Sequence, residues 1–280
     1  MSVDVEEHFQ VQAFVKYAPR SEWPRHPSRV EGNTRRLLDL FDETGARATF
    51  FTLGCVAKDH PSLVRDIVTR GHEMASHGMD HRMLTELTPD EFRAQARDSR
   101  ALLEDLGGAP VLGFRAPSYS VGRTTLWAID VLAQTGYAYD SSVYPIRRRR
   151  YGYPEGPRRP ARMAGPGGAV LAEFPLPSLG VGPWRAPVLA GAYLRLFPSA
   201  LSRFALERHR GDALIVNVHP WEIDPEQPVV GPSRHATWTH YLRLGRVEGI
   251  LRDLLRRSRF RTALDVLREM GLVSHSGTNC

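Results

Sequence analysis

The 280-residue sequence contains little cysteine, almost no lysine and no long apolar run. Its two cysteines, Cys55 inside an apolar segment and Cys280 at the end, cannot build a disulfide framework, so we expect a reducing compartment. No stretch approaches the roughly 18 consecutive apolar residues of a membrane helix, so we expect no membrane span. The opening around Asp4 is acidic and lacks the basic and apolar regions of a secretory signal, which predicts a cytoplasmic location.

Positive charge is carried almost entirely by arginine, and the formal net charge is +6. Such an excess can indicate an anionic partner, but the arginines are spread along the chain, which favours a coding preference for arginine over lysine. No nucleic-acid-binding motif accompanies the arginines, so we expect no nucleic-acid partner. The basic loop at residues 147–162 either contacts an anionic substrate or is simply solvated. Its arginines are Arg147, Arg148, Arg149, Arg150, Arg158, Arg159 and Arg162.

Hydrophobic periodicity predicts short strands that alternate with amphipathic helices. The predicted strands are Ser2–Val5, Ala48–Leu53, Glu73–Ser76, Val111–Phe114, Tyr137–Tyr139, Val170–Phe174 and Ala213–Val218. The predicted helices are Val30–Thr44, Ser62–Arg70, Pro89–Leu106, Arg123–Thr135 and Ala190–His209, followed by two basic helices near 239–257 and 260–271. Residues 145–168, rich in Arg, Pro and Gly, predict a long loop. Repeated strand–helix units without a long linker predict one α/β domain, with active residues at the C-terminal ends of its strands.

The strongest chemical signal is the pair His77 and His81, directly after the predicted strand Glu73–Ser76. Two histidines four residues apart on a helical turn point the same way, so both can reach one metal ion. Asp4 and Glu6 share a face in regular β geometry, so one can complete a His₂–carboxylate site while the other acts as a base. The alternatives are a chance histidine pair and a solvated acidic terminus.

Three further segments follow predicted strands. Arg115 can pair with a buried carboxylate and hold it ionised, while Pro117 stiffens the turn so that a backbone N–H can face an oxyanion. Asp140 precedes two serines, a pattern that also suits a helix cap or a turn. His219 ends the last predicted strand beside Trp221, a position that suits a general acid, with a core histidine as the alternative.

In this order and spacing, the segments resemble the polysaccharide deacetylase family, also called the NodB homology or carbohydrate esterase family 4 domain. The motifs that carry the resemblance are Thr49-Phe50-Phe51, Ser76-His77-x-x-x-His81, Arg115-x-Pro117-x-Tyr119 and His219-Pro220. A bacterial branch associated with exopolysaccharide gene clusters and the exosortase (PEP-CTERM) system is most similar, through Val3-Asp4-Val5-Glu6, Asp140-Ser141-Ser142 and His219-Pro220-Trp221-Glu222. The resemblance implies a single-domain distorted (β/α)7-type barrel over residues 1–225, with a basic helical extension, residues 226–280, packed on it.

The resemblance also implies an activity: metal-dependent removal of N-acetyl groups from the amino sugars of an exopolysaccharide or its precursor. Zinc is the default ion, with cobalt, nickel and iron as alternatives. The implied partner is an N-acetylated polysaccharide or oligosaccharide. The implied residues are the metal ligands Glu6, His77 and His81, the base Asp4 oriented by Arg115, an oxyanion donor at the Tyr119 backbone N–H beside Pro117, and the acid His219 supported by Asp140.

Two departures from the family pattern leave alternatives. The usual first motif has adjacent aspartates, whereas Asp4 and Glu6 are separated, so their roles can be exchanged or Glu7 involved. The usual tryptophan after the fourth-motif aspartate is missing, so Tyr144 or Trp221 would form the wall around the acyl methyl. Two other functions stay open on the same barrel: hydrolysis of a small amide, and metal-free carbohydrate binding. The sequence does not determine the oligomeric state.

Overall fold

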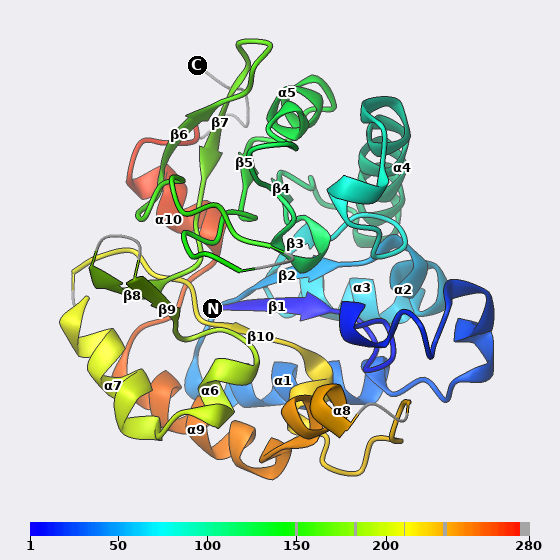
Figure 1. The fold of residues 1–280 in the computed structure, drawn as a ribbon, viewed down its shortest axis with the longest axis vertical. Helices are drawn as coiled ribbons and strands as arrows, with labels where there is room; N and C mark the ends of the chain where they lie inside the picture. Colours follow the sequence, from blue (N-terminus) through cyan, green and yellow to red (C-terminus); the bar gives the residue numbers. More distant parts are fainter. Residues whose placement is uncertain (149–150, 182–183, 210, 232–233, 275–280) are drawn as a thin grey trace.

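A computed structural model of the chain describes residues 1–148, 151–181, 184–209, 211–231 and 234–274. Within these ranges eight strands form one curled sheet in the order β10-β1-β2-β3-β4-β5-β7-β6, with helices around its outside (Figure 1). Neighbouring strands are parallel, except that β6 runs antiparallel to β7. The strands are β1 (Ser2–Val5), β2 (Thr49–Thr52), β3 (Glu73–Ser76), β4 (Gly113–Phe114), β5 (Tyr139–Asp140), β6 (Ala161–Ala164), β7 (Val170–Glu173) and β10 (Asn217–Val218), with β8 (Ser178–Val181) and β9 (Trp184–Pro187) forming a separate hairpin.

The helices follow the strands in the alternation that the sequence predicts, which confirms the α/β class and the incomplete barrel. Among the described residues, no helix combines the length and apolarity that a membrane crossing requires. The α-helices are α1 (Val30–Thr44), α2 (Gly54–Asp59), α3 (Pro61–Thr69), α4 (Pro89–Gly107), α5 (Trp127–Gln134), α6 (Ala192–Leu196), α7 (Ser199–Arg208), α8 (Arg234–Tyr241), α9 (Val247–Arg257) and α10 (Ala263–Glu269). The 3₁₀ segments include η1 (Gln12–Phe14), η4 (Pro117–Tyr119) and η5 (Pro220–Ile223).

Strand β1 shows how side-chain alternation positions polar groups inside the curl. Val3 and Val5 join the apolar cluster between the sheet and the outer helices. Ser2 and Asp4 point to the opposite face because successive side chains alternate along a strand. There the Ser2 hydroxyl donates to Asn217 Oδ1 at 2.7 Å, on the neighbouring strand β10. The carboxylate of Asp4 therefore lies inside the curled sheet, near the C-terminal end of its strand.

The interior of the sheet is filled at the other end of the strands by a second apolar cluster. It includes Phe51 and Tyr139 from the sheet and Leu267 from α10. The backbone N–H of Ala263, at the start of α10, donates to the hydroxyl of Thr49 at 2.7 Å. Helix α10 is thus fastened to the N-terminal end of β2 as part of the same domain. The predicted division between residues 225 and 226 stays a prediction.

The predicted ranges of β1, α1 and β3 are confirmed, and the larger differences lie in the second half of the chain. Part of the predicted loop 145–168 forms β6, which pairs with β7. The predicted helix Ala190–His209 is two helices, because Pro198 disfavours a helical conformation at Phe197, whose ψ is 158°. The predicted strand Ala213–Val218 joins the sheet only through β10.

Gly113 in β4 provides a test of the packing between neighbouring strands. A β-carbon there would lie 2.2 Å from the ring carbon and the hydroxyl oxygen of Tyr139. We expect Gly113→Ala to lower the free energy of unfolding by about 1–3 kcal/mol, because the buried ring must move. The control is Gly249→Ala in α9, where a β-carbon meets nothing within 4 Å and which should gain about 0.5–1 kcal/mol. Urea unfolding measures both, and equal effects would contradict the packing described.

Candidate active site

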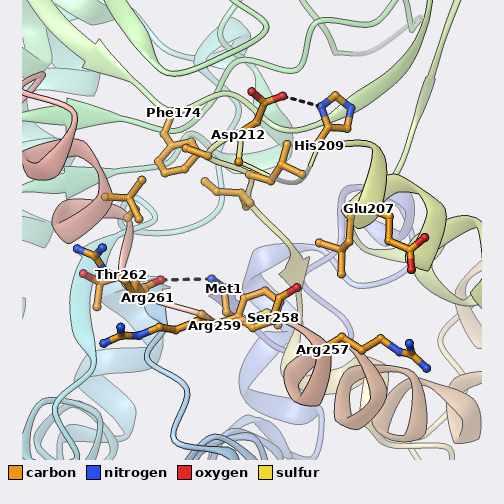
Figure 2. Close-up of a pocket in the computed structure, with 18 of the residues that line it drawn as sticks. Met1, Phe174, Glu207, His209, Asp212, Arg257, Ser258, Arg259, Arg261 and Thr262 are labelled. Carbon is orange, nitrogen blue, oxygen red and sulfur yellow. Dashed lines mark hydrogen bonds and ion pairs between the residues drawn. The ribbon is translucent and has the colours of Figure 1, made fainter.

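Seven of the ten predicted site residues line one cavity at the C-terminal ends of the parallel strands, and Arg115, Pro117 and Asp140 lie outside its lining. Its volume is about 400 Å³, and its lining includes Asp4, Glu6, His77, His81, Tyr119, His219 and Trp221. A larger hollow of about 530 Å³ lies at the opposite end of the barrel, beside Phe174 and Thr262 (Figure 2). That hollow contains none of the predicted site residues, and two of its polar side chains, His209 and Asp212, pair with each other at 3.1 Å.

Glu6, His77 and His81 form a buried cluster whose ligand atoms all lie within 4.8 Å of one another. Glu6 Oε2 is 2.8 Å from His81 Nε2 and 4.0 Å from His77 Nε2. Despite this closeness, Glu6 Oε2 has no hydrogen-bond partner of acceptable geometry among the described residues. His77 Nδ1 contacts the Arg115 carbonyl oxygen at 2.8 Å, which directs Nε2 toward Glu6. This donor set and the orphaned carboxylate oxygen fit a divalent cation.

Both histidines lie on an irregular turn after β3, so the predicted helical turn is wrong. Gly78 and His81 adopt positive φ values of 79° and 57°. The turn is fixed from outside, since the Gly54 N–H donates to the Gly78 carbonyl at 2.9 Å and Arg20 Nε donates to the Asp80 carbonyl at 2.9 Å. A left-handed conformation at a non-glycine residue costs of order 1–2 kcal/mol and is often found at functional sites. The two imidazoles converge through this strained turn.

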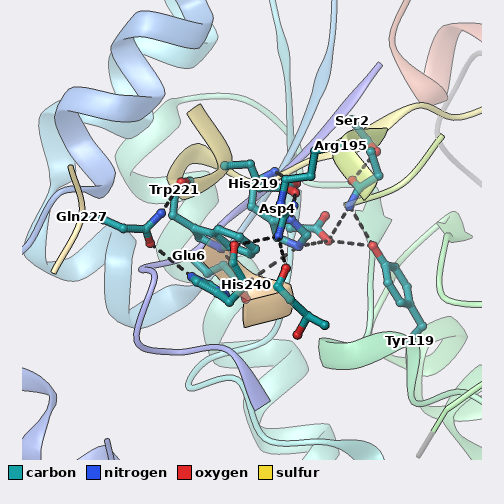
Figure 3. A network of polar contacts seen from close by, with 12 residues as sticks. Ser2, Asp4, Glu6, Tyr119, Arg195, His219, Trp221, Gln227 and His240 are labelled. Carbon is teal, nitrogen blue, oxygen red and sulfur yellow. Dashed lines mark hydrogen bonds and ion pairs between the residues drawn. The ribbon is translucent and has the colours of Figure 1, made fainter. Parts of the chain in front are cut away.

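Asp4 lies beside this cluster but has different partners (Figure 3). Its Oδ1 accepts from Arg115 Nη1 at 2.7 Å. Its Oδ2 accepts from Asn217 Nδ2 at 3.1 Å and from the Tyr119 hydroxyl at 3.3 Å, and lies 3.7 Å from His219 Nε2. Burial opposes the charge, but Arg115 and the nearby histidines lower the pKa of Asp4 below its usual range. The carboxylate is therefore held ionised inside the protein.

Arg115 is fully buried and bonds to three strands or strand ends. Besides Asp4, its Nη1 lies 2.9 Å from the Ser2 hydroxyl and 2.5 Å from Asn217 Oδ1. Its Nε and Nη2 donate to the carbonyl and hydroxyl oxygens of Ser141 at 2.9 and 2.8 Å. Sequence reasoning missed Ser2 and Asn217. The signal was their spacing, because each lies two residues before a predicted site residue and so shares its face.

The carboxylate partner of His219 is Glu222, and not Asp140 as predicted. His219 Nδ1 lies 3.0 Å from Glu222 Oε2, which also accepts from the His219 backbone N–H at 3.1 Å. Glu222 Oε1 pairs with the buried Arg195. Burial disfavours the imidazolium, but Glu222 outweighs it with help from the site carboxylates, and the pKa of His219 is raised to about 9. The sequence signal that could have predicted this contact is the spacing of Glu222, three residues after His219, which a 3₁₀ turn brings next to the imidazole.

Asp140 instead belongs to a buried carboxyl pair with Glu173 of β7. Its Oδ1 accepts from the Ser142 hydroxyl at 2.5 Å, and Glu173 Oε1 accepts from the Val143 N–H at 3.0 Å. The other two carboxyl oxygens have no further partner among the described residues. Burial raises the pKa of Asp140 to about 6 and that of Glu173 well above its usual range. One proton between the two carboxyls satisfies both orphaned oxygens.

The turn at η4 does not offer the oxyanion donor that the resemblance implied. The Tyr119 backbone N–H donates to the Ala116 carbonyl at 3.0 Å and is therefore already used. Ser118 and Tyr119 both have positive φ, at 55° and 52°, and the Tyr119 hydroxyl lies near Asp4. Pro117 is buried and does not line the cavity. The contribution of Tyr119 at this site is its phenol.

Both candidates for the acyl wall line the cavity. Trp221 stacks on the imidazole of His219, with ring centroids 4.9 Å apart, and its indole N–H donates to Glu6 Oε1 at 3.3 Å. Its other neighbour is His240, at 4.1 Å between centroids. The Tyr144 ring lies beside that of Tyr119, with 5.5 Å between their centroids. Aromatic side chains thus lie at both predicted positions, and their role as an acyl wall stays a prediction.

Glu7, the alternative acid, belongs to the start of α1 and not to the cavity. Its carboxylate accepts from the Ser28 hydroxyl at 2.5 Å and from the backbone N–H groups of Arg29 and Val30 at 3.0 and 3.2 Å. These contacts satisfy N–H groups at the helix N-terminus. Glu7 is thus occupied in stabilising α1.

Comparison with known families agrees with this geometry. Residues 24–139 match the model of the polysaccharide deacetylase family, and residues 141–268 match a domain of unknown function, DUF3473. The two matches together confirm the resemblance to the polysaccharide deacetylase family and to its exosortase-associated branch.

Two groups of curated relatives match part of the chain. A chitooligosaccharide deacetylase of Sinorhizobium fredii is 35% identical over 112 residues, which are 40% of this chain and 49% of that protein. A peptidoglycan-N-acetylglucosamine deacetylase of Bacillus cereus is 27% identical over 120 residues, covering 39% of this chain and 44% of that protein. The chain thus spans about half the length, or less, of these relatives.

Solved structures share the fold at low sequence identity. A structure from Mycobacterium smegmatis described as a polysaccharide deacetylase has a TM-score of 0.63 at 19% identity, covering 100% of this chain and 90% of that one. An allantoinase has a TM-score of 0.58 at 17% identity, covering 91% and 75%. A structure from Pseudomonas aeruginosa described as a polysaccharide deacetylase has a TM-score of 0.53 at 16% identity, covering 84% and 71%.

The Asp140–Glu173 pair predicts a pH dependence of stability. Both folded-state pKa values lie above the unfolded values near 4, so the stability that the protonated pair contributes falls as pH rises, passing through about 6 for Asp140. Glu173→Gln keeps an acceptor for Val143 and supplies an N–H toward Asp140. We expect the difference in unfolding free energy between this variant and the wild type to shift in favour of the variant by of order 1 kcal/mol from pH 5 to pH 9.

Thermal unfolding at pH 5, 7 and 9 measures this difference. The control is Glu155→Gln, which removes an exposed carboxylate and should follow the wild type at each pH. A Glu173→Gln variant that loses stability in parallel with the wild type would show that the pair carries no shared proton.

Proposed function

We propose that the chain is a metal-dependent hydrolase that removes N-acetyl groups from the amino sugars of a polysaccharide or its precursor. One observation carries the proposal: a His₂–carboxylate cluster, an arginine-paired carboxylate and a carboxylate-backed imidazole line one cavity. Relatives named as chitooligosaccharide and peptidoglycan deacetylases support the choice of an N-acetylated saccharide. The resemblance to the exosortase-associated branch supports an exopolysaccharide as its source.

Glu6, His77 and His81 would hold the divalent ion, because their donor atoms converge and Glu6 Oε2 is otherwise unsatisfied. A set of two imidazoles and one carboxylate favours zinc, with cobalt, nickel or iron as alternatives. When bound, such an ion polarises the acetamide carbonyl and lowers the pKa of water.

Asp4 is proposed as the general base. Its Oδ1 is committed to Arg115, whereas Oδ2 has only the weaker contacts with Asn217 and Tyr119 and faces His219. Because Arg115 keeps the carboxylate ionised, Oδ2 can accept a proton from the attacking water. Arg115 also fixes the direction in which the proton acceptor points.

His219 is proposed as the general acid. An amine is a poor leaving group unless it is protonated, so the reaction needs a proton donor at the amide nitrogen. Glu222 occupies Nδ1, which leaves Nε2 as the free donor, and Nε2 lies 3.7 Å from both Asp4 Oδ2 and Glu6 Oε1. The acid thus borders the same space as the base and the proposed ligands.

Hydrolysis of a small cyclic or linear amide is the second candidate. A cavity of about 400 Å³ is of the size that encloses a small molecule, and an allantoinase shares the fold. Acetate release from chitooligosaccharides, compared with hydrolysis of allantoin and simple acetamides, separates the two candidates.

Metal content tests the proposed ligands. We expect His77→Ala and His81→Ala to reduce the bound metal from about one ion per chain to below about 0.1, because each removes one of three protein ligands. Asp4→Asn is the matched control, since it should keep the metal while lowering acetate release from chitotetraose by about 10²–10⁴-fold. Elemental analysis of the purified full-length proteins gives the occupancy.

Three results would decide against parts of this assignment. Full occupancy in a histidine variant would remove that histidine from the ligand set. An active Asp4→Asn variant would transfer the base to another residue. A wild type with neither bound metal nor metal-stimulated acetate release would favour a carbohydrate-binding protein.

The role of Glu222 predicts a dependence on the leaving group. A 4-nitrophenolate leaves without protonation, so hydrolysis of 4-nitrophenyl acetate does not need a general acid, whereas hydrolysis of an acetamide does. We expect Glu222→Gln to lower kcat for chitotetraose by about 10–100-fold while changing aryl acetate hydrolysis by less than about twofold.

His219→Ala is the positive control and should divide the two substrates in the same way. Glu222→Gln leaves the buried charge of Arg195 without its carboxylate partner, which can destabilise the fold. The double variant Glu222→Gln with Arg195→Gln removes both charges and is measured as a second test. An equal loss on both substrates, in variants that unfold at the wild-type temperature, would contradict the role in protonation.

A further inference from the structure

One side of the cavity carries none of the proposed metal ligands, nor the proposed base or acid. Tyr144, Tyr151 and Tyr193 line this side, next to Tyr119. The rings of Tyr119 and Tyr144 are 5.5 Å apart, and Tyr144 and Tyr151 are stacked at 6.2 Å with 23° between their planes. Since the Tyr119 hydroxyl contacts Asp4, a continuous aromatic wall extends from the proposed base along the cavity. We call Tyr119, Tyr144, Tyr151 and Tyr193 the tyrosine wall.

One polar atom of the tyrosine wall has no hydrogen-bond partner in the part of the chain that the structure describes. Tyr144 is 1% exposed, and its hydroxyl has no hydrogen-bond partner of acceptable geometry among the described residues. The Val188 backbone approaches this hydroxyl without meeting that geometry. A buried hydroxyl left unpaired lowers stability, so such a group beside a cavity is suited to a polar ligand atom.

Arg148 brings a positive charge to the outer end of the wall. Its guanidinium interacts with the side chains of Tyr151 and Tyr193, whose hydroxyls lie 3.3 Å from each other. Arg148 has no ion pair with an aspartate or glutamate in the described ranges, whereas Arg159 of the same basic loop pairs with Asp212 at 3.2 Å. Phenol contacts orient the guanidinium without neutralising it, so its charge remains available. Two other members of the loop, residues 149 and 150, lie outside the described residues.

We propose that Arg148 and the tyrosine wall form a subsite for an anionic substituent on the sugar unit adjoining the N-acetyl group. The subsite rests on the proposed function and narrows its substrate class to acidic N-acetylated saccharides. The shared chemistry is a carboxylate or phosphate group. The planar guanidinium of Arg148 binds two of its oxygens, the Tyr144 hydroxyl donates to a ring or acid oxygen, and the aromatic rings pack against the sugar face.

Calorimetric titration of the full chain tests the subsite with three probes. They are chitotetraose, which is neutral, a hyaluronan tetrasaccharide, in which N-acetylglucosamine alternates with glucuronate, and UDP-N-acetylglucosamine, which carries a diphosphate. We expect the dissociation constant of at least one anionic probe to be about tenfold lower than that of chitotetraose. Arg148→Gln should remove this preference, because it weakens binding of the anionic probe more than binding of chitotetraose.

Arg147→Gln is the matched control, because it removes the same charge from the neighbouring exposed position. It should keep the preference. If Arg148→Gln weakens binding of the hyaluronan tetrasaccharide, the substituent that the subsite binds is a carboxylate. If it weakens binding of UDP-N-acetylglucosamine, the substituent is a phosphate. No preference for either anionic probe, or equal losses in both arginine variants, would overturn the subsite.

Binding and turnover separate this inference from the proposed function. An Arg148-dependent preference in a chain that releases no acetate from any probe would refute the deacetylase and keep the subsite. Acetate release from chitotetraose, with no preference for an anionic probe in binding, would refute the subsite alone.

Discussion

The buried ion pair between Arg115 and Asp4 is the interaction on which the rest of the site depends. Removing two charges from water is costly, and their attraction compensates only when further hydrogen bonds satisfy the remaining donors and acceptors. Ser2, Asn217 and Ser141 supply those bonds from β1, β10 and the end of β5. Breaking such a pair by removing one partner typically costs 3–5 kcal/mol. The polar half of the barrel interior is thus organised around one guanidinium, and Asp4 takes its charge and direction from it.

Four further carboxylates near this pair have different environments, and each environment suits a different task. The histidine cluster faces Glu6, and although burial opposes the charge, His81 and its neighbours lower the pKa of Glu6 to about 2. Glu222 faces His219 and favours its protonated form. Asp140 and Glu173 form a buried pair, and burial raises the pKa of both carboxyls, which favours a shared proton. When neighbouring groups have environments that shift their pKa values in opposite directions, one site can contain a base, a metal ligand and an acid at the same pH.

Much of this arrangement could be predicted from local patterns, and the remainder depends on tertiary contacts. Side-chain alternation along β1 and the position of residues at strand ends predict that Asp4, Glu6 and His219 lie close together, and all three line one cavity. The spacing of His77 and His81 predicted their convergence but not the positive φ that produces it, because outside contacts hold that turn. Periodicity does not encode the direction of short turns. It therefore could not show that the Tyr119 N–H is hydrogen-bonded within η4, or that His219 contacts Glu222 and not Asp140.

The central claim is that Asp4 in β1 and Glu6 directly after it have different roles. Glu6 is a ligand of a metal ion, and Asp4 is paired with Arg115. Anomalous diffraction from a zinc-loaded crystal of the full chain tests this division most directly. The account predicts one strong peak within coordination distance of Glu6, His77 and His81, with Asp4 still bound to Arg115 and outside the ligand set. A peak coordinated by Asp4 in place of Glu6, or no peak in this cavity, would contradict it.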